Sequence, residues 1–338
     1  MIGAGPVAQA IHLPTIARLD GRVEVVAVLD PNLELAREVA RPLGALACQS
    51  MEKLLSAAKI DIAVIGSPNA FHAQQTMALC AAGVRGILVE KPLGVSRDEA
   101  EQVRKAVASS GASLVVGAMH TYDEGWLRAL EALRSWGDLA GHGPFHARLV
   151  CHIPANEYFE DMASQIVRPA SGGAGPTPTP GELVSGGVLG LAIHNLPHLR
   201  HFIPAITDVA HAVPAKPWGY AITAVGVGGT LELLARTGGT WRPDWTLSVF
   251  GHDLSFEMNF PPSYVHTGSA TTTVVLPDGS TSVFGGGLEN GYLAEWRELL
   301  GIMDGAEPRY SVETLVEDLD YALGLAELAS AAADRAVL

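Results

Sequence analysis

The sequence contains little cysteine, few basic residues and no long apolar run. Its three cysteines, Cys48, Cys80 and Cys151, lie far apart and form no CxxC pair. This spacing argues against a metal site or a disulfide framework and fits the reducing cytoplasm. No stretch reaches the roughly 18 apolar residues that a membrane helix requires. The chain also begins directly with a glycine-rich turn, which does not resemble a signal peptide.

The shortage of positive charge excludes further classes of partner. Only 22 Lys and Arg residues stand against 36 Asp and Glu residues, which gives a formal net charge of -14. Without a basic patch, we expect neither nucleic acid nor an anionic membrane as a partner. Hydrophobic residues make up 48% of the 338 positions, which is enough for the cores of two domains.

The first 118 residues alternate between strand-like and helix-like segments. Short β-branched runs at 23–29, 60–65, 86–89 and 113–118 read as buried parallel strands. Helical spacing follows at 33–43, 71–82 and 96–110, and Ser96 with Glu99 has the capping-box spacing. This alternation predicts an α/β Rossmann domain, a doubly wound parallel sheet, over residues 1–118.

Residues 119–338 predict an α+β domain with a large, open-faced, mostly antiparallel sheet. Helical patterns cover 123–136, 186–203 and 312–335. Strand-like stretches occupy 145–153, 219–226, 230–236, 245–250, 253–260, 271–276 and 281–285. Residues 169–187 are rich in Gly, Pro, Ser and Thr, and we expect them to form a mobile loop over a cleft.

A GxGxxA turn opens the chain and predicts a dinucleotide site. It reads Gly3-Ala4-Gly5-Pro6-Val7-Ala8, and Gly3, Gly5, Pro6 and Val7 are the expected contacts. The first glycine permits the tight turn, the second lets the backbone approach the pyrophosphate, and the helix N-terminus holds the phosphates. Only two residues precede Gly3, so either the native start lies upstream or the numbering begins inside the chain.

Asp30 indicates which dinucleotide is bound. It follows the next strand at about the spacing of the ribose-binding acid. A carboxylate there accepts hydrogen bonds from both ribose hydroxyls and repels a 2′-phosphate. No Arg or Lys occupies 31–33 to offset that repulsion, so NAD is the expected cofactor.

Several short motifs resemble the Gfo/Idh/MocA family, which includes glucose–fructose oxidoreductase and inositol dehydrogenase. They are Glu90-Lys91-Pro92, Ser67-Pro68-Asn69-Ala70-Phe71-His72, Gly186-Gly187 with His194, and the tail Trp296…Gly305…Pro308…Ser311. The resemblance implies that Lys91 contacts both substrate and nicotinamide, and that the following proline is commonly cis. It also implies that the open sheet often mediates oligomerisation, and that Ser67, Pro68, Asn69, His72 and Glu90 lie beside the cofactor.

The second half departs from the family pattern at one position. His194 aligns with the family histidine, but Gly190 stands where the family commonly has an aspartate, one helical turn earlier. We expect this glycine to leave room in the cleft, and His198 to lie on the same helix face as His194. His120 and Tyr122 follow the last Rossmann strand, where the family places substrate contacts. The expected substrate-binding residues are therefore Lys91, His120, Tyr122, His194 and His198.

These features predict a cytoplasmic, NAD(H)-dependent oxidoreductase that acts on a secondary alcohol of a sugar, glycoside or cyclitol. Lys91 and His194 are the expected proton-transfer residues, because hydride transfer from an alcohol requires a base. A homodimer or homotetramer is expected, and no metal. Two alternatives remain open: an NAD-binding sensor without turnover, like the yeast galactose repressor of this family, and an NAD-assisted lyase or glycosidase with transient oxidation.

Overall fold

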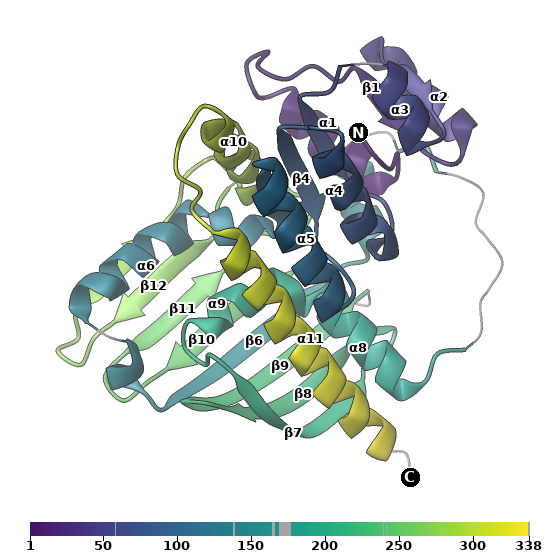
Figure 1. Cartoon of the computed structure of the whole chain (residues 1–338). Coiled ribbons are helices and arrows are strands. Elements are labelled where there is room, and N and C mark those ends of the chain that lie inside the picture. The colour runs from purple at the N-terminus through teal and green to yellow at the C-terminus, as the bar shows by residue number, and fades with distance from the viewer. Residues whose placement is uncertain are drawn as a thin grey trace. The chain divides into compact units, whose positions relative to one another are not determined.

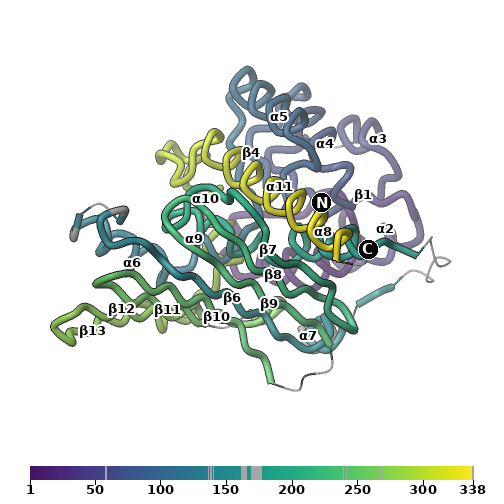
Figure 2. Tube along the Cα trace, turned by 90° about the horizontal axis from the view of Figure 1, so that it is seen from below, coloured from purple at the N-terminus to yellow at the C-terminus, as the bar shows by residue number. Residues whose placement is uncertain are grey.

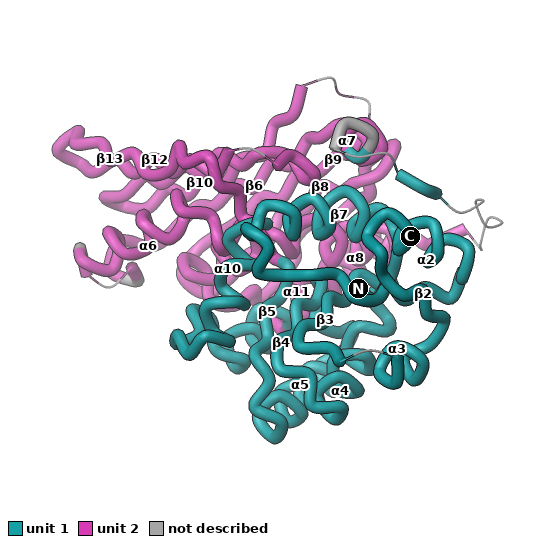
Figure 3. The backbone as a smooth tube through the Cα atoms, turned by 90° about the horizontal axis from the view of Figure 1, so that it is seen from above, with its two compact units in different colours: residues 1–117, 160–174, 292–319 teal, residues 118–159, 175–291, 320–338 magenta. Residues whose placement is uncertain are grey.

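The chain divides into two compact units, coloured separately in Figure 3. The computed structural model describes residues 1–57, 59–137, 139–163, 166–168, 177–238, 240, 242–266 and 268–336. The first unit contains Met1–Gly117, Glu160–Ala174 and Tyr292–Leu319, and the second contains the remaining segments. A single division near residue 118 therefore omits two later segments of the first unit.

The first unit contains a parallel sheet. Its strands are β1 (Ala27–Leu29), β2 (Leu46–Cys48), β3 (Ile62–Ile65), β4 (Gly86–Glu90) and β5 (Ser113–Gly117). The pair β1-β2 and the group β3-β4-β5 are both parallel, and Ile2 joins them through single parallel bridges to Leu29 and Ile65. The predicted Rossmann sheet is confirmed.

Helices separate these strands as the spacing predicts. They are α2 (Leu33–Ala40), α3 (Met51–Ala57), α4 (His72–Ala81) and α5 (Arg97–Ser110), and α10 (Gly291–Met303) comes later in the chain. Ser96 caps α5, because its hydroxyl accepts a hydrogen bond from the Glu99 backbone N–H at 3.2 Å. The sequence reading missed β2 and α3, since both are short and largely exposed.

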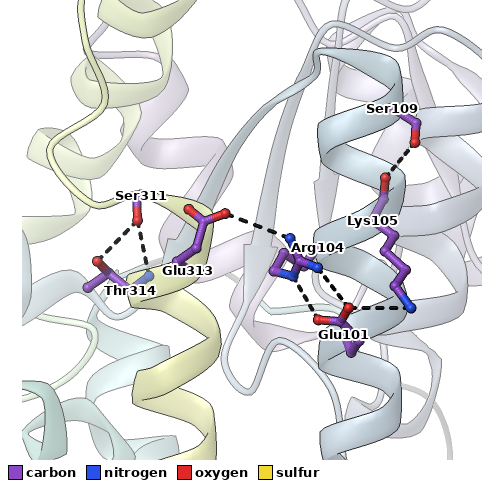
Figure 4. A network of polar contacts seen from close by, with 7 residues as sticks. All are labelled: Glu101, Arg104, Lys105, Ser109, Ser311, Glu313 and Thr314. Carbon is purple, nitrogen blue, oxygen red and sulfur yellow. Dashed lines mark hydrogen bonds and ion pairs between the residues drawn. The ribbon is translucent and has the colours of Figure 1, made fainter.

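A surface network connects α5 with the start of α11 (Val312–Arg335), as Figure 4 shows. The Arg104 guanidinium binds Glu101 at 2.7 Å and lies 3.9 Å from Glu313. The hydrogen bond from Arg104 lowers the pKa of Glu101 to about 2. Exposed pairs of this kind contribute little stability, so the buried residues Val103 and Val107 anchor α5 instead.

The second unit contains an eight-stranded sheet in the order β13-β12-β11-β10-β6-β9-β8-β7, and Figure 2 follows its strands. Their bounds are β6 (Phe145–Ile153), β7 (Ile206–Pro214), β8 (Trp218–Gly226), β9 (Gly229–Thr237), β10 (Asp244–Phe250), β11 (Ser255–Asn259), β12 (Thr271–Val275) and β13 (Thr281–Phe284). Every pair is antiparallel except β6 with β9. The predicted open-faced sheet is confirmed.

Helices cover one face of this sheet (Figure 1). Helix α6 (Glu124–Trp136) packs against β12 and β13, and α8 (Pro180–Gly190) packs against β7 and β8. The covered face buries Leu247, Phe256 and Val274, whereas the opposite face carries charged residues such as Arg148 and Glu232. This alternation of buried and exposed residues is what the strand patterns predict.

Two predictions for residues 169–203 are wrong. The part of the expected loop at 169–176 lies outside the described residues. Residues 180–187, also expected as loop, belong to helix α8. A capping box formed by Thr179 and Glu182 begins this helix. The helix expected over 186–203 is broken after Gly190. A short 3₁₀ turn, Ala192–His194, and helix α9, Leu196–Arg200, follow it. Glycines are poor helix formers, and the proline at 197 favours a new helix start there.

The remaining described elements are short, apart from α7 (Asn156–Ala163). They include α1 (Leu13–Ile16) and the π-helical turn Ala8–His12 that precedes it. In the parts of the chain that the structure describes, no helix is long and apolar enough to cross a bilayer.

Candidate active site

The glycine turn has the shape that a dinucleotide requires. Gly3 has a φ of +88°, and a Cβ there would lie 2.5 Å from the carbonyl oxygen of Gly66, so only glycine fits. A Cβ at Gly5 would instead project into open space. Helical backbone begins at Pro6 and Val7, which directs backbone N–H groups toward this opening. The predicted cradle is therefore compatible with a bound pyrophosphate.

Asp30 is held in place beside this turn. One carboxylate oxygen accepts a hydrogen bond from the Ala4 N–H at 3.1 Å, and the other accepts one from the Asn32 N–H at 2.8 Å. The carboxylate thus joins the end of β1 to the glycine turn, where the ribose-binding acid of a dinucleotide site belongs.

His72 links the segments that follow two strands, β3 and β4. Its ring nitrogens lie 2.7 Å from the Pro92 carbonyl oxygen and 2.8 Å from the Ser67 carbonyl oxygen. Both nitrogens are therefore engaged by the protein's own backbone, and the side chain is buried. Between Ser67 and His72 in the sequence, Pro68 is extended and Asn69 begins a 3₁₀ turn. Pro68 and Asn69 therefore stay candidates for cofactor contact.

Glu90 is likewise engaged within the protein. Its carboxylate accepts from the Nε2 of His12 at 3.1 Å, and the His12 Nδ1 accepts from the Trp296 indole N–H at 3.3 Å. An indole N–H can only donate, which places the His12 proton on Nε2. This chain of contacts fixes the strand that carries Lys91, and sequence reasoning missed His12 because its partners are remote in sequence.

Lys91 follows directly at the carboxyl end of β4. The peptide bond between Lys91 and Pro92 is cis, as the resemblance implies. The side chain is partly buried. Burial lowers the pKa of the Lys91 ammonium below its usual range, although the nearby Glu90 carboxylate opposes that shift. A lysine of this kind can exchange a proton nearer to neutral pH than a solvated one.

The second unit gathers three histidines in an aromatic environment. The rings of His120 and His194 are 6.5 Å apart, and the His198 Nε2 donates to the His120 carbonyl oxygen at 3.1 Å. Trp245 stacks edge-on against both His120 and His194. The expected substrate histidines are thus brought together, while Tyr122 is buried in the 3₁₀ turn Met119–Tyr122 that also carries His120.

The surroundings of Gly190 differ from expectation. A Cβ at this position would lie 3.3 Å from the Trp218 ring, so the indole occupies the space that the missing side chain was expected to leave. The helix also ends here, so residues 190, 194 and 198 do not share one continuous helix face.

One cavity of about 240 Å³ lies in the first unit, with Met1, Val25, Ile60, Ile62 and Trp296 among its lining residues. Val25 precedes β1 and Ile60 precedes β3, which puts the cavity at the amino ends of these strands. Ligands of open α/β sheets bind at the carboxyl ends, so this cavity is not the cofactor site. Among the described residues, no cluster of three or more His, Cys, Asp or Glu could hold a metal.

The fold and the glycine turn together define a nicotinamide-dinucleotide-binding Rossmann unit joined to an open-sheet unit. Residues 1–118 match the model of an oxidoreductase family with an NAD-binding Rossmann fold, the Gfo/Idh/MocA family. The predicted resemblance to that family is thus confirmed over these residues.

Curated relatives resemble this chain over part of its length. Inositol 2-dehydrogenase 3 of Saccharopolyspora erythraea is 30% identical over 169 residues, which cover 49% of this chain and 48% of the relative. D-glucoside 3-dehydrogenase of Escherichia coli is 29% identical over 123 residues, 36% of this chain and 34% of the relative. The matches thus span about half, or less, of the length of these relatives.

Solved structures resemble the whole fold. UDP-N-acetylglucosamine 3-dehydrogenase from Acidithiobacillus ferrooxidans has a TM-score of 0.69 at 19% identity, covering 98% of this chain and 97% of that protein. A 3-ketoreductase from Actinomadura kijaniata, in complex with TDP-benzene and NADP, has a TM-score of 0.69 at 17% identity, covering 96% and 94%. At these identities the likeness concerns the fold.

Proposed function

We propose that this protein is an NAD(H)-dependent oxidoreductase that moves hydride to or from a secondary alcohol carbon of a sugar, glycoside or cyclitol. The observation that carries the proposal is Lys91, a partly buried lysine whose pKa is lowered, at the carboxyl end of β4 in the same unit as the glycine turn. The names of the relatives, which are dehydrogenases of inositol, a glucoside and a nucleotide sugar, support this substrate class.

Each assigned residue has one task. The bound dinucleotide would supply the hydride acceptor or donor. Backbone N–H groups of the glycine turn hold its pyrophosphate, and Asp30 holds its ribose. The Lys91 nitrogen contacts the substrate alcohol, whose proton must leave as hydride departs. His194 belongs to the substrate pocket of the second unit.

NAD is proposed over NADP. The Asp30 carboxylate would face a 2′-phosphate, and both of its oxygens are already directed by backbone N–H groups. The residues that follow it, Pro31 and Asn32, carry no charge that would offset the repulsion. The related 3-ketoreductase was solved with NADP, so the two cofactors must be compared directly.

A sensor that binds NAD without turnover is the second candidate. The observation in its favour is Gly190, where the family acid is missing and Trp218 packs instead. One experiment separates the candidates: a screen of sugars, cyclitols and glycosides with NAD and NADP in parallel, in which the absorbance of NADH is the readout. Steady NADH production supports the dehydrogenase. Cofactor binding without any turnover supports the sensor, and product formation without net NADH supports the lyase or glycosidase.

We also propose that the protein is a cytoplasmic homodimer or homotetramer that associates through the open face of its eight-stranded sheet. That face exposes three large hydrophobic residues, Val225, Phe250 and Val283, the last of them 64% exposed. Exposed apolar side chains grouped on one sheet face are typical of an interface between subunits.

A further inference from the structure

Gln9 joins the glycine turn to a segment that lies 158 positions further along the chain. Its side-chain Nε2 donates hydrogen bonds to the Ala4 carbonyl oxygen at 2.7 Å and to the Val167 carbonyl oxygen at 2.9 Å. Its Oε1 accepts a hydrogen bond from the Val167 N–H at 2.8 Å. These contacts settle which end of the amide is nitrogen, because a carbonyl oxygen only accepts and an N–H only donates. All of these residues belong to the first unit.

The Gln9 amide is buried and held firmly. Gln9 is only 5% exposed, and Val167 packs against a core cluster that includes Leu35 and Val39. Burying an amide is unfavourable unless its polar atoms are paired, and here both the oxygen and the nitrogen are paired. Gln9 also lies in the π-helical turn Ala8–His12, a rare backbone form that is frequent at functional sites. A glutamine held in this way has one orientation and can fix the orientation of the group that it binds.

The group that Gln9 binds in the turn is the peptide between Ala4 and Gly5. In a planar trans peptide the carbonyl oxygen and the N–H point in opposite directions. The Ala4 oxygen is directed to Gln9, so the Gly5 N–H points away from Gln9. A Cβ on Gly5 would meet no atom within 4 Å, so the space beside this residue is open. The Ala4 N–H is also fixed, because it donates to Asp30.

Pro6 increases the importance of the Gly5 N–H. A helix N-terminus binds an anion through N–H groups that have no partner within the helix, but proline carries no N–H. The nearest donors are therefore the N–H groups of Gly5 and Val7, on either side of Pro6. If the peptide before Gly5 rotated, a bound phosphate would lose one of these two donors.

We propose that Gln9, held by Val167, is a positioning residue that orients the Gly5 N–H toward the pyrophosphate of the dinucleotide. The inference rests on the proposed function, which supplies the dinucleotide. It also gives the segment 166–168 a task, because the backbone of Val167 holds the Gln9 amide. Affinity for the cofactor then depends on a contact far from the glycine turn in sequence, while the transfer of hydride does not.

The test compares the Kd for NADH of the wild type, Gln9→Met and Val167→Pro by fluorescence titration. Methionine keeps the length of the glutamine side chain but forms no strong hydrogen bond. We expect Gln9→Met to raise the Kd about 10- to 100-fold, the usual weight of a hydrogen bond to a charged group. With saturating cofactor, kcat should change less than about threefold, because lost binding affects KM rather than kcat. Val167→Pro removes the N–H that binds the Gln9 oxygen and should raise the Kd by a smaller factor.

Thr15→Val is the matched control. Thr15 is fully buried in the helix that follows the π-helical turn, and its hydroxyl donates to the Ile11 carbonyl oxygen at 2.7 Å. The valine variant loses a buried hydrogen bond from a side chain to the backbone without touching the glycine turn. It should lower Tm and leave the Kd for NADH unchanged. An equal rise of the Kd in this variant would show that general loosening, and not the Gln9 contact, weakens binding.

A second readout tests the pyrophosphate itself. ADP-ribose contains the pyrophosphate and adenosine lacks it. Gln9→Met should weaken ADP-ribose as much as NADH, and competition by adenosine should stay as in the wild type. A Gln9→Met variant that binds NADH like the wild type, or that weakens adenosine equally, overturns this inference alone, and an unchanged Kd in Val167→Pro refutes the role of Val167. A wild type that binds NADH but turns over no polyol overturns the proposed function, and the binding comparison still decides this inference.

Discussion

Lys91 is the side chain on which the proposed chemistry depends most. Lys91→Met keeps the length and apolar stem of the side chain but removes the nitrogen that contacts the alcohol. We expect kcat to fall about 100- to 10,000-fold, the usual contribution of an acid–base group. NADH binding, followed by fluorescence titration, should stay nearly intact, because backbone amides of the glycine turn hold the pyrophosphate. A variant that keeps more than about a tenth of kcat contradicts the assignment.

Asp30 should determine the choice of cofactor. We expect kcat/KM to favour NAD over NADP by at least about tenfold, which corresponds to about 1.4 kcal/mol. Replacing Asp30 by serine together with Pro31→Arg should shift the preference toward NADP, because it substitutes a cation for the carboxylate. Asp30→Asn is the control that removes the charge without supplying a cation. Its preference for NAD over NADP should lie between that of the wild type and that of the double variant. A wild type that prefers NADP refutes the assignment.

Buried His198 should make the protein sensitive to acid. Its pKa is about 3 in the folded chain against an ordinary value of 6.5, because burial disfavours the charged ring. The unfolded chain therefore takes up the proton first. The contribution of neutral His198 to the stability of the folded state is fully present above pH 6.5. It is lost progressively as the pH falls toward 3.

The free energy of unfolding should fall by about 1.4 kcal/mol for each pH unit between 6.5 and 3. Urea unfolding at pH 7 and pH 5 measures it. His198→Gln cannot take up the proton, yet its amide can still donate to the His120 carbonyl oxygen, so its stability should change less between these pH values. His146→Gln, at an exposed histidine of β6, is the control and should behave like the wild type. Equal acid sensitivity in the His198 variant and the wild type would show that another group is responsible.

At the scale of elements, the sequence predicts well where a periodic pattern is long and unbroken. Strand β6 and helix α11 have the bounds that the alternation and the helical spacing predict. Strand β7 was missed because two register shifts disturb its alternation. Helix α8 was mistaken for loop because glycine and proline are frequent in it, and its capping box lies beside a segment of similar composition.

The site was predicted less completely than the fold, for a physical reason. The glycine turn, Asp30 and the cis Lys91–Pro92 bond have local signatures that can be read from neighbouring residues. The contacts of His12 with Trp296 and of Gln9 with Val167 join residues 284 and 158 positions apart. No local pattern in the sequence indicates such pairs, because only the folded backbone brings the two residues together.

At the scale of the whole molecule, we expect an oligomer. Light scattering at micromolar concentration should give the mass of a dimer or tetramer, since Phe250 and Val283 on the open sheet face would otherwise remain in water. Val283→Lys places a charge on that face and should shift the population toward the monomer. Val95→Lys, which adds the same charge at an exposed valine of the other unit, is the matched control. A monomeric wild type refutes the proposed assembly.

The arrangement of β6 also has a consequence for how the protein is made. Its two neighbours in the sheet, β9 and β10, follow much later in the chain, and His146 of β6 faces Thr230, which lies 84 positions further on. While the ribosome is still extending the chain, both edges of β6 lack these partners, and an unpaired edge is a template for association with other chains. Translation stalled before residue 229 should therefore yield nascent chains that depend on chaperones, whereas release after residue 250 allows the strand to close its ladder on both sides.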